Sequence, residues 1–71
     1  MTFAICLDNE DYEASLELRK IYKVVPPEAS DPKGYIRIVD ESGEDYLYST
    51  NGFEIIELPP RIERKLVAAL R

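Results

Sequence analysis

The chain of 71 residues contains no histidine, no tryptophan and a single cysteine. Histidine is the commonest general base near neutral pH and the commonest metal ligand, so its absence removes the usual centre of both chemistries. One cysteine can form neither an internal disulfide nor a thiolate zinc site. We therefore expect a protein that is not an enzyme, with no catalytic residues, no metal and no cofactor.

Glycine-rich phosphate-binding motifs and long apolar runs are also missing. The three glycines, Gly34, Gly43 and Gly52, all lie at expected turns, so phosphate cradling is not expected. No apolar run approaches the roughly 20 residues that span a bilayer, and the first residues lack the basic region of a signal peptide. With the lone cysteine, these features predict a cytoplasmic protein without membrane contact.

Negative charge dominates most of the sequence. Residues 1–58 carry five basic and 13 acidic side chains, whereas residues 59–71 carry four basic and one acidic, which gives the net charge of −5. An acidic body repels phosphates, so nucleic acid is disfavoured as a partner despite the basic tail. We expect the tail to dock on the acidic body; the alternative is a separate partner site in the tail.

Carboxylates gather in two predicted turns, at residues 8–13 and 40–45. Oxygen ligands at this spacing could hold calcium, but Glu13 occupies the position at which an EF-hand loop needs glycine. We interpret both clusters as solvated turn residues.

Short alternating apolar segments, separated by turn residues, predict a mostly β fold. The expected strands cover residues 2–7, 21–25, 35–39, 45–49 and 53–58. A hairpin turn at Gly43 should join the third strand to the fourth. Residues 12–18 are interpreted as an extended arm that returns to the body, with a short helix as the alternative.

The alternation also predicts which side chains form the core. In the first strand, the large side chains of Phe3, Ile5 and Leu7 share one face, and Cys6 lies on the other as a small buried side chain. The expected core comprises Ile5, Leu7, Leu18, Tyr22, Val24, Ile36, Ile38, Leu47, Phe53 and Ile55.

The last residues have the pattern of an amphipathic helix. Two prolines end the last strand and suit a first helical turn, and Ile62, Leu66 and Leu70 recur at helical spacing. We expect this apolar stripe to pack on the same chain or to mediate self-association. The chain is thus divided into a β domain over residues 1–58 and a helix over residues 59–71.

Three stretches together form a wider pattern: residues 18–24, residues 35–48 with the hairpin motif Asp-x-Ser-Gly-x-Asp-Tyr, and Phe53-Glu54. This pattern, over roughly residues 3–57, resembles a group of small uncharacterised bacterial and phage proteins with a Src-homology-3-like (SH3-like) β-barrel. The resemblance implies a small five-stranded antiparallel SH3-like barrel, here with a short C-terminal helix. Where the group often has a glycine before the aromatic strand, this chain has Arg19-Lys20.

Tyrosines are the most numerous aromatic residues of the chain. In SH3-like barrels, tyrosines from a loop and a neighbouring strand can line a shallow peptide groove. The resemblance therefore implies a partner-binding surface at Tyr12, Tyr46 and Tyr48, with Asp11 and Glu44 on its acidic rim; the alternative is ordinary half-buried packing. The sequence thus predicts a protein-interaction or accessory module with an unidentified protein partner. A structural or oligomerising unit that uses the C-terminal helix is the alternative function.

Overall fold

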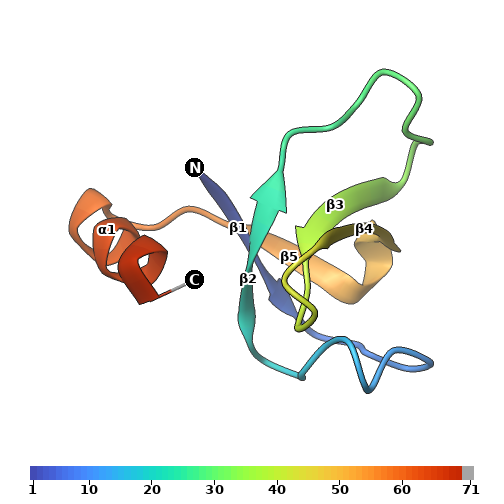
Figure 1. The fold of residues 1–71 in the computed structure, drawn as a ribbon, viewed down its shortest axis with the longest axis horizontal. Coiled ribbons are helices and arrows are strands. Elements are labelled where there is room, and N and C mark those ends of the chain that lie inside the picture. The colour runs from blue at the N-terminus through green and yellow to red at the C-terminus, as the bar shows by residue number, and fades with distance from the viewer. Residues whose placement is uncertain (70–71) are drawn as a thin grey trace.

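The computed structural model describes residues 1–69, which form one antiparallel sheet followed by a helix (Figure 1). The strands are β1 (Thr2–Cys6), β2 (Ile21–Val25), β3 (Tyr35–Val39), β4 (Asp45–Ser49) and β5 (Phe53–Ile56). A 3-10 turn, η1 (Thr50–Gly52), joins β4 to β5, and helix α1 spans Pro60–Ala69. The predicted mostly β fold with a C-terminal helix is confirmed.

The strands are ordered β4-β3-β2-β1-β5, so the last strand pairs with the first. Ala4 of β1 lies opposite Tyr22 of β2 on one side and Ile55 of β5 on the other. The expected hairpin joins β3 to β4, and Gly43 supplies the positive φ of 85° that its turn requires. The strands β4 and β5 form the two edges of the sheet, which is not closed.

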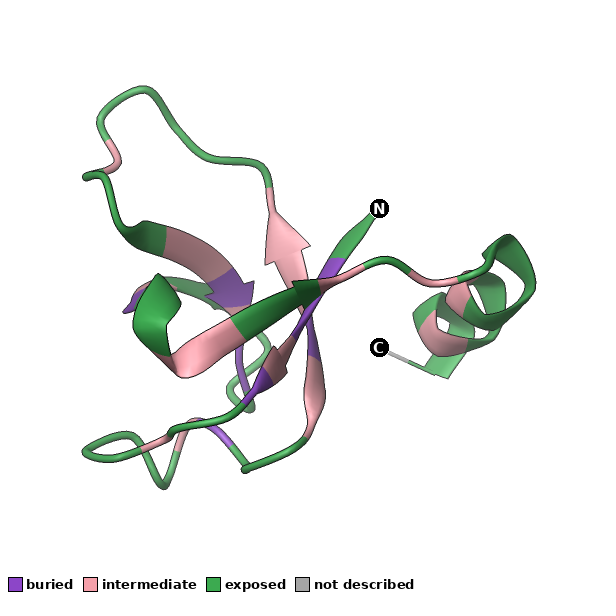
Figure 2. Ribbon diagram, turned by 180° about the vertical axis from the view of Figure 1, so that it is seen from behind, coloured by how far each residue is buried: buried purple, intermediate pink, exposed green. Residues whose placement is uncertain are grey.

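In the core, side chains from all five strands pack with one residue of the loop between β1 and β2. Figure 2 shows where the buried residues lie along the ribbon. That loop residue, Leu16, is 1% exposed. Tyr22 and Ile38 are buried as predicted, and Val24, Ile36 and Phe53 pack against them. The complete buried cluster comprises Ala4, Cys6, Leu16, Tyr22, Ile38 and Tyr48.

The sequence-based prediction of which face of β1 points into the core was wrong. Ala4 and Cys6 are fully buried in the core, whereas Ile5 is only half-buried and Leu7 is 55% exposed. Alternation determines which residues share a face but not which face turns inward. Small side chains on β1 leave room for larger ones from the other elements, and the predicted burial of Cys6 is confirmed. Phe3 is also fully buried, outside this cluster.

Three other core predictions are corrected. Leu18 is 43% exposed, because the loop turns Leu16 inward instead. Ile55 is 49% exposed, and it lies on an edge strand with a neighbour on one side only. Leu47 is half-buried, while the next residue, Tyr48, takes the core position on β4.

The segment between β1 and β2, which we call the arm (residues 7–20), is neither extended nor helical. It is a series of turns in which the backbone N–H groups of Ser15 and Leu16 both donate to the Tyr12 carbonyl. Its base is closed by the N–H of Arg19, which donates to the Cys6 carbonyl at 2.6 Å. Arg19 has a φ of 63°, a backbone conformation that favours glycine.

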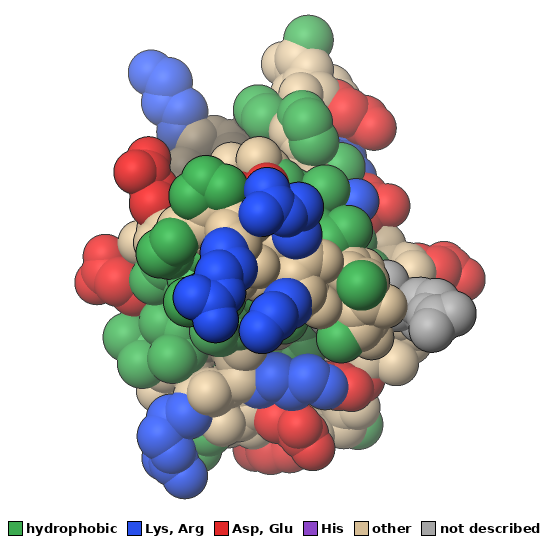
Figure 3. Space-filling view, turned by 90° about the vertical axis from the view of Figure 1, so that its left-hand side faces the viewer, with side chains coloured by type: hydrophobic (Ala, Val, Ile, Leu, Met, Phe, Trp, Pro, Cys, Tyr) green, Lys and Arg blue, Asp and Glu red, His purple; other side chains and the backbone are tan. Residues whose placement is uncertain are grey.

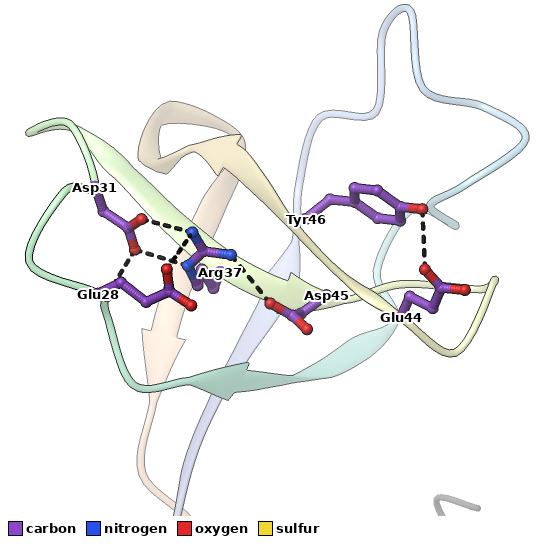
Figure 4. A network of polar contacts seen from close by, with 6 residues as sticks. All are labelled: Glu28, Asp31, Arg37, Glu44, Asp45 and Tyr46. Atoms are coloured by element: carbon purple, nitrogen blue, oxygen red, sulfur yellow. Dashed lines mark hydrogen bonds and ion pairs between the residues drawn. The ribbon is translucent and has the colours of Figure 1, made fainter.

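The loop that begins with Pro26-Pro27 is held to the sheet by Arg37 of β3 (Figure 4). Its guanidinium donates two hydrogen bonds to Asp31, at 2.8 and 2.7 Å, and one to Asp45 of β4 at 3.1 Å. The bond with Arg37 is the main reason why the pKa of Asp31 is lowered. Arg37 is therefore a structural clamp between this loop and the β3–β4 hairpin.

Helix α1 stands at one end of the molecule, and the arm lies at the other (Figures 1 and 2). Among the described residues, none of the helix is fully buried; Leu66 and Glu63 are half-buried, and Glu63 pairs with the Met1 ammonium group at 3.4 Å. Ile62 of the predicted apolar stripe is 51% exposed, and Leu70 lies outside the described residues. Neither helical segment within residues 1–69 is long and apolar enough to cross a bilayer.

Candidate binding groove

The structure brings together two of the predicted tyrosines from distant parts of the sequence. Tyr12 of the arm and Tyr48 of β4 pack edge to face, with ring centroids 5.0 Å apart and an interplanar angle of 84°. Tyr48 also packs at a tilt against Phe53 of β5, with centroids 6.1 Å apart. This geometry is a favourable one for aromatic rings, so the arm is attached to the sheet by aromatic packing.

Tyr48 is fixed in place by its hydroxyl group, which donates to Oδ2 of Asp40 at 2.6 Å. Asp40 is 6% exposed and also accepts bonds from the backbone N–H and hydroxyl of Ser42, at 2.9 and 2.6 Å. Burial opposes the charge of Asp40, but the bonds from Ser42 and Tyr48 outweigh it and lower its pKa. Burial and the bond to Asp40 raise the pKa of Tyr48 to about 12, so this tyrosine is a permanent neutral donor.

Two hollows open on either side of the Tyr12–Tyr48 pair. The first, of about 380 Å³, lies between the arm and the η1 turn and is lined by Tyr12, Tyr48 and Phe53 together with Asp8, Glu10, Asp11, Leu16, Ser49, Asn51 and Gly52. The second, of about 390 Å³, lies between the arm and the β3–β4 hairpin and is lined by Tyr12, Tyr46 and Tyr48 together with Ser15, Asp40, Ser42 and Leu47. Because Tyr12 and Tyr48 line both hollows, we describe the two together as the tyrosine groove.

Tyr46 lines the second hollow and is 50% exposed. Its hydroxyl donates to Oε1 of Glu44 at 3.3 Å, as Figure 4 shows, and the charge of Glu44 raises the pKa of Tyr46. Glu44 itself lines neither hollow and reaches the groove only through this contact. The three predicted tyrosines thus meet in one groove, although Tyr48 is buried and offers a partner only part of its ring.

The first hollow has an acidic rim, which includes the predicted residue Asp11. Asp8, Glu10 and Asp11 line it, and none of them forms an ion pair with any residue of 1–69. Oδ1 of Asp8 accepts the backbone N–H of Glu10 at 2.9 Å, which holds this part of the arm in a turn. The rim therefore presents negative charge that no cation of the described part of the chain pairs with.

Gly52 determines how closely the arm approaches η1, a role that sequence reasoning did not identify. Its carbonyl accepts the backbone N–H groups of Leu7 and Asp8, at 2.8 and 3.3 Å. A Cβ atom at this position would lie 2.9 Å from the carbonyl oxygen of Asp8, closer than real Cβ atoms come. The sequence marked Gly52 only as a turn residue, because the contact joins segments far apart in the chain.

The chemistry of the groove suits binding more than reaction. Cys6 is buried on β1, away from the lining of the groove, and this burial raises the pKa of its thiol. Within residues 1–69, no three His, Cys, Asp or Glu side chains are placed together as metal ligands. What the groove offers is aromatic surface, hydroxyl groups and carboxylates.

A larger hollow of about 470 Å³ lies where β2, the β3–β4 turn and the end of α1 meet. Three of its polar side chains bond to one another, because Oε2 of Glu41 accepts bonds from Lys20 at 2.6 Å and from the Tyr22 hydroxyl at 2.5 Å. These internal bonds leave few groups free for a ligand, so we place the candidate site in the tyrosine groove. Comparisons with protein-family models, curated proteins and solved structures find no match for this chain.

Proposed function

We propose that this protein is a non-enzymatic interaction module that binds a segment of a partner protein in the tyrosine groove. The observation that carries the proposal is the Tyr12–Tyr48 pair, whose two rings line a hollow on each side. Exposed tyrosines combine a large apolar surface with a hydroxyl group at low entropic cost, which is why they are enriched in protein interfaces.

The proposal includes an SH3-like barrel as the scaffold of the groove. The antiparallel sheet of five strands, with the last strand beside the first, supports this assignment within residues 1–69. So does the position of the groove, between a long loop and a neighbouring strand, as the resemblance implies. Fold alone does not fix activity, so the functional part of the proposal depends on the groove.

The charge of the groove indicates the chemistry of the partner. Asp8, Glu10 and Asp11 form no ion pairs among the described residues, so a segment with lysine or arginine would neutralise them on binding. The aromatic rings favour an apolar residue beside those cations. The partner segment is thus expected to be basic and partly apolar.

The test is capture of partners from a native lysate with the wild type and with two groove variants, Tyr12→Ala and Tyr46→Ala. Tyr48 is not a suitable site for this test, because its removal would disturb the core. The matched control is Tyr35→Ala, which removes a tyrosine of similar exposure, 49%, that lines neither hollow.

Mass spectrometry should identify a protein captured by the wild type and by Tyr35→Ala but lost from both groove variants. Circular dichroism should show equal folding in all four proteins. Equal capture by the wild type and the groove variants would show that the tyrosine groove is not the binding site.

A further inference from the structure

Helix α1 carries exposed basic and apolar side chains near one end of the molecule. Arg61, Arg64 and Lys65 form no ion pair with any residue of 1–69. In Figure 3, which views the molecule from the α1 end, basic side chains gather at the centre of the face with hydrophobic ones around them. Ile62 is 51% exposed, and its helical spacing places Lys65 beside it on the same side of α1.

This surface of α1 and the first hollow of the tyrosine groove are complementary in chemistry. The helix offers an exposed isoleucine flanked by cations, and the hollow offers aromatic walls rimmed by carboxylates that form no ion pair within residues 1–69. The same contrast holds for the whole chain, since residues 1–58 carry 13 acidic and five basic side chains. Such complementarity favours a specific encounter between the two surfaces.

The two surfaces cannot meet within one molecule. Figure 1 shows α1 and the arm at opposite ends of the longest axis, along which the molecule extends 31 Å. Two α1 helices are also poor partners for each other, because both would bring Arg61, Arg64 and Lys65 to the contact and repel. The remaining arrangement joins the helix of one copy to the groove of another.

We propose that α1 of one copy docks in the first hollow of the tyrosine groove of a second copy. Ile62 would contact the aromatic wall at Tyr12, and Arg61 and Lys65 would meet the acidic rim. This inference rests on the proposed function, since it names an occupant of the same groove. The contact is head to tail, so each pair keeps one free helix and one free groove, and assembly should grow with protein concentration.

The test uses two full-length variants in sedimentation velocity over a range of concentrations. In Arg61→Glu/Lys65→Glu the helix is blocked, and in Glu10→Gln/Tyr12→Ala the groove is blocked without gaining a positive charge that could attract the altered helix. The wild type should increase in mass with concentration, and each variant alone should stay monomeric. An equal mixture of the two variants should form a dimer and nothing larger, because it contains one working helix and one working groove per pair.

A matched control separates this contact from a general effect of charge. Lys33→Glu makes one such reversal of charge, from positive to negative, in the loop before β3, outside the tyrosine groove and α1, and should associate like the wild type. A wild type that stays monomeric throughout, or a mixture of the two variants that forms no dimer, would overturn the inference. Binding of the monomeric wild type, but not of Arg61→Glu/Lys65→Glu, to phosphatidylserine vesicles would also overturn it, since the helix would then bind an anionic membrane surface.

The outcome also separates this inference from the proposed function. A monomeric wild type that still captures another protein through Tyr12 and Tyr46 overturns the self-association and keeps the interaction module. In a second outcome, the wild type self-associates, Tyr12→Ala abolishes this association, and no other protein is captured. That outcome supports the inference and shows that the partner of the groove is a second copy of this chain.

Discussion

The bond between Tyr48 and Asp40 is the contact whose removal should affect stability most clearly. The substitution Tyr48→Phe keeps the ring and its edge-to-face packing on Tyr12, and removes only the hydroxyl that donates to the carboxylate at 2.6 Å. Asp40 is 6% exposed, so water cannot readily replace the lost donor. A hydrogen bond to a charged group contributes about 1.5–3 kcal/mol, and we expect Tyr48→Phe to lower the free energy of unfolding by about 2 kcal/mol.

The assay is urea denaturation followed by circular dichroism at pH 7. For a domain of this size, a loss of about 2 kcal/mol corresponds to a fall in Tm of roughly 8–16 °C. The matched control is Tyr46→Phe on the same strand, whose hydroxyl is exposed and 3.3 Å from its acceptor. Exposed substitutions of this kind usually change stability by less than about 0.5 kcal/mol.

The same pair predicts a dependence on pH. The pKa of Asp40 is lower in the folded state than in the unfolded chain, so its ionised form stabilises the fold above the unfolded pKa. This contribution is lost as pH falls through the folded pKa. The difference between wild type and Tyr48→Phe should therefore be full at pH 7 and should shrink in acid, once the pH falls through the lowered pKa of Asp40. A difference below about 0.5 kcal/mol at pH 7, or one that does not shrink in acid, would refute this account of the bond.

Three further substitutions test the contacts that shape the loops. Gly52→Ala should lower the free energy of unfolding by about 1–3 kcal/mol in urea denaturation, because the new Cβ would press on the Asp8 carbonyl 2.9 Å away; unchanged stability would contradict that close approach. Arg19→Gly should raise the free energy of unfolding by up to about 1 kcal/mol, because relief of roughly 1–2 kcal/mol of left-handed backbone strain exceeds the cost of the added entropy of the unfolded chain. The control Arg19→Ala should give no gain in stability. Arg37→Lys keeps the charge but loses the two-pronged bond to the proline loop, so hydrogen exchange should accelerate over residues 26–34 and not in the sheet. Equal protection of that loop in both proteins would show that Arg37 does not clamp it.

Local sequence patterns were sufficient to predict the strands, the C-terminal helix and the mostly β class of the fold. Alternation, prolines and glycines located the five strands to within two residues at each end, because these signals are local properties of the backbone. The Gly43 hairpin and the helix that begins at Pro60 followed from the same local rules. The choice of Tyr12, Tyr46 and Tyr48 as a candidate surface came instead from what the resemblance to SH3-like barrels implies.

Only the tertiary structure decided which face of each strand turned inward and how the arm packed. Ala4 and Cys6, not Leu7, face the core, because the larger side chain of Leu16 packs against these two small residues. Leu16 comes from a loop whose path no local sequence pattern predicts. On β4 the buried residue is likewise Tyr48 and not the predicted Leu47, since the Tyr48 hydroxyl donates a hydrogen bond to Asp40 across the hairpin. Burial and the groove depend on contacts between distant segments, and alternation along one strand carries no information about them.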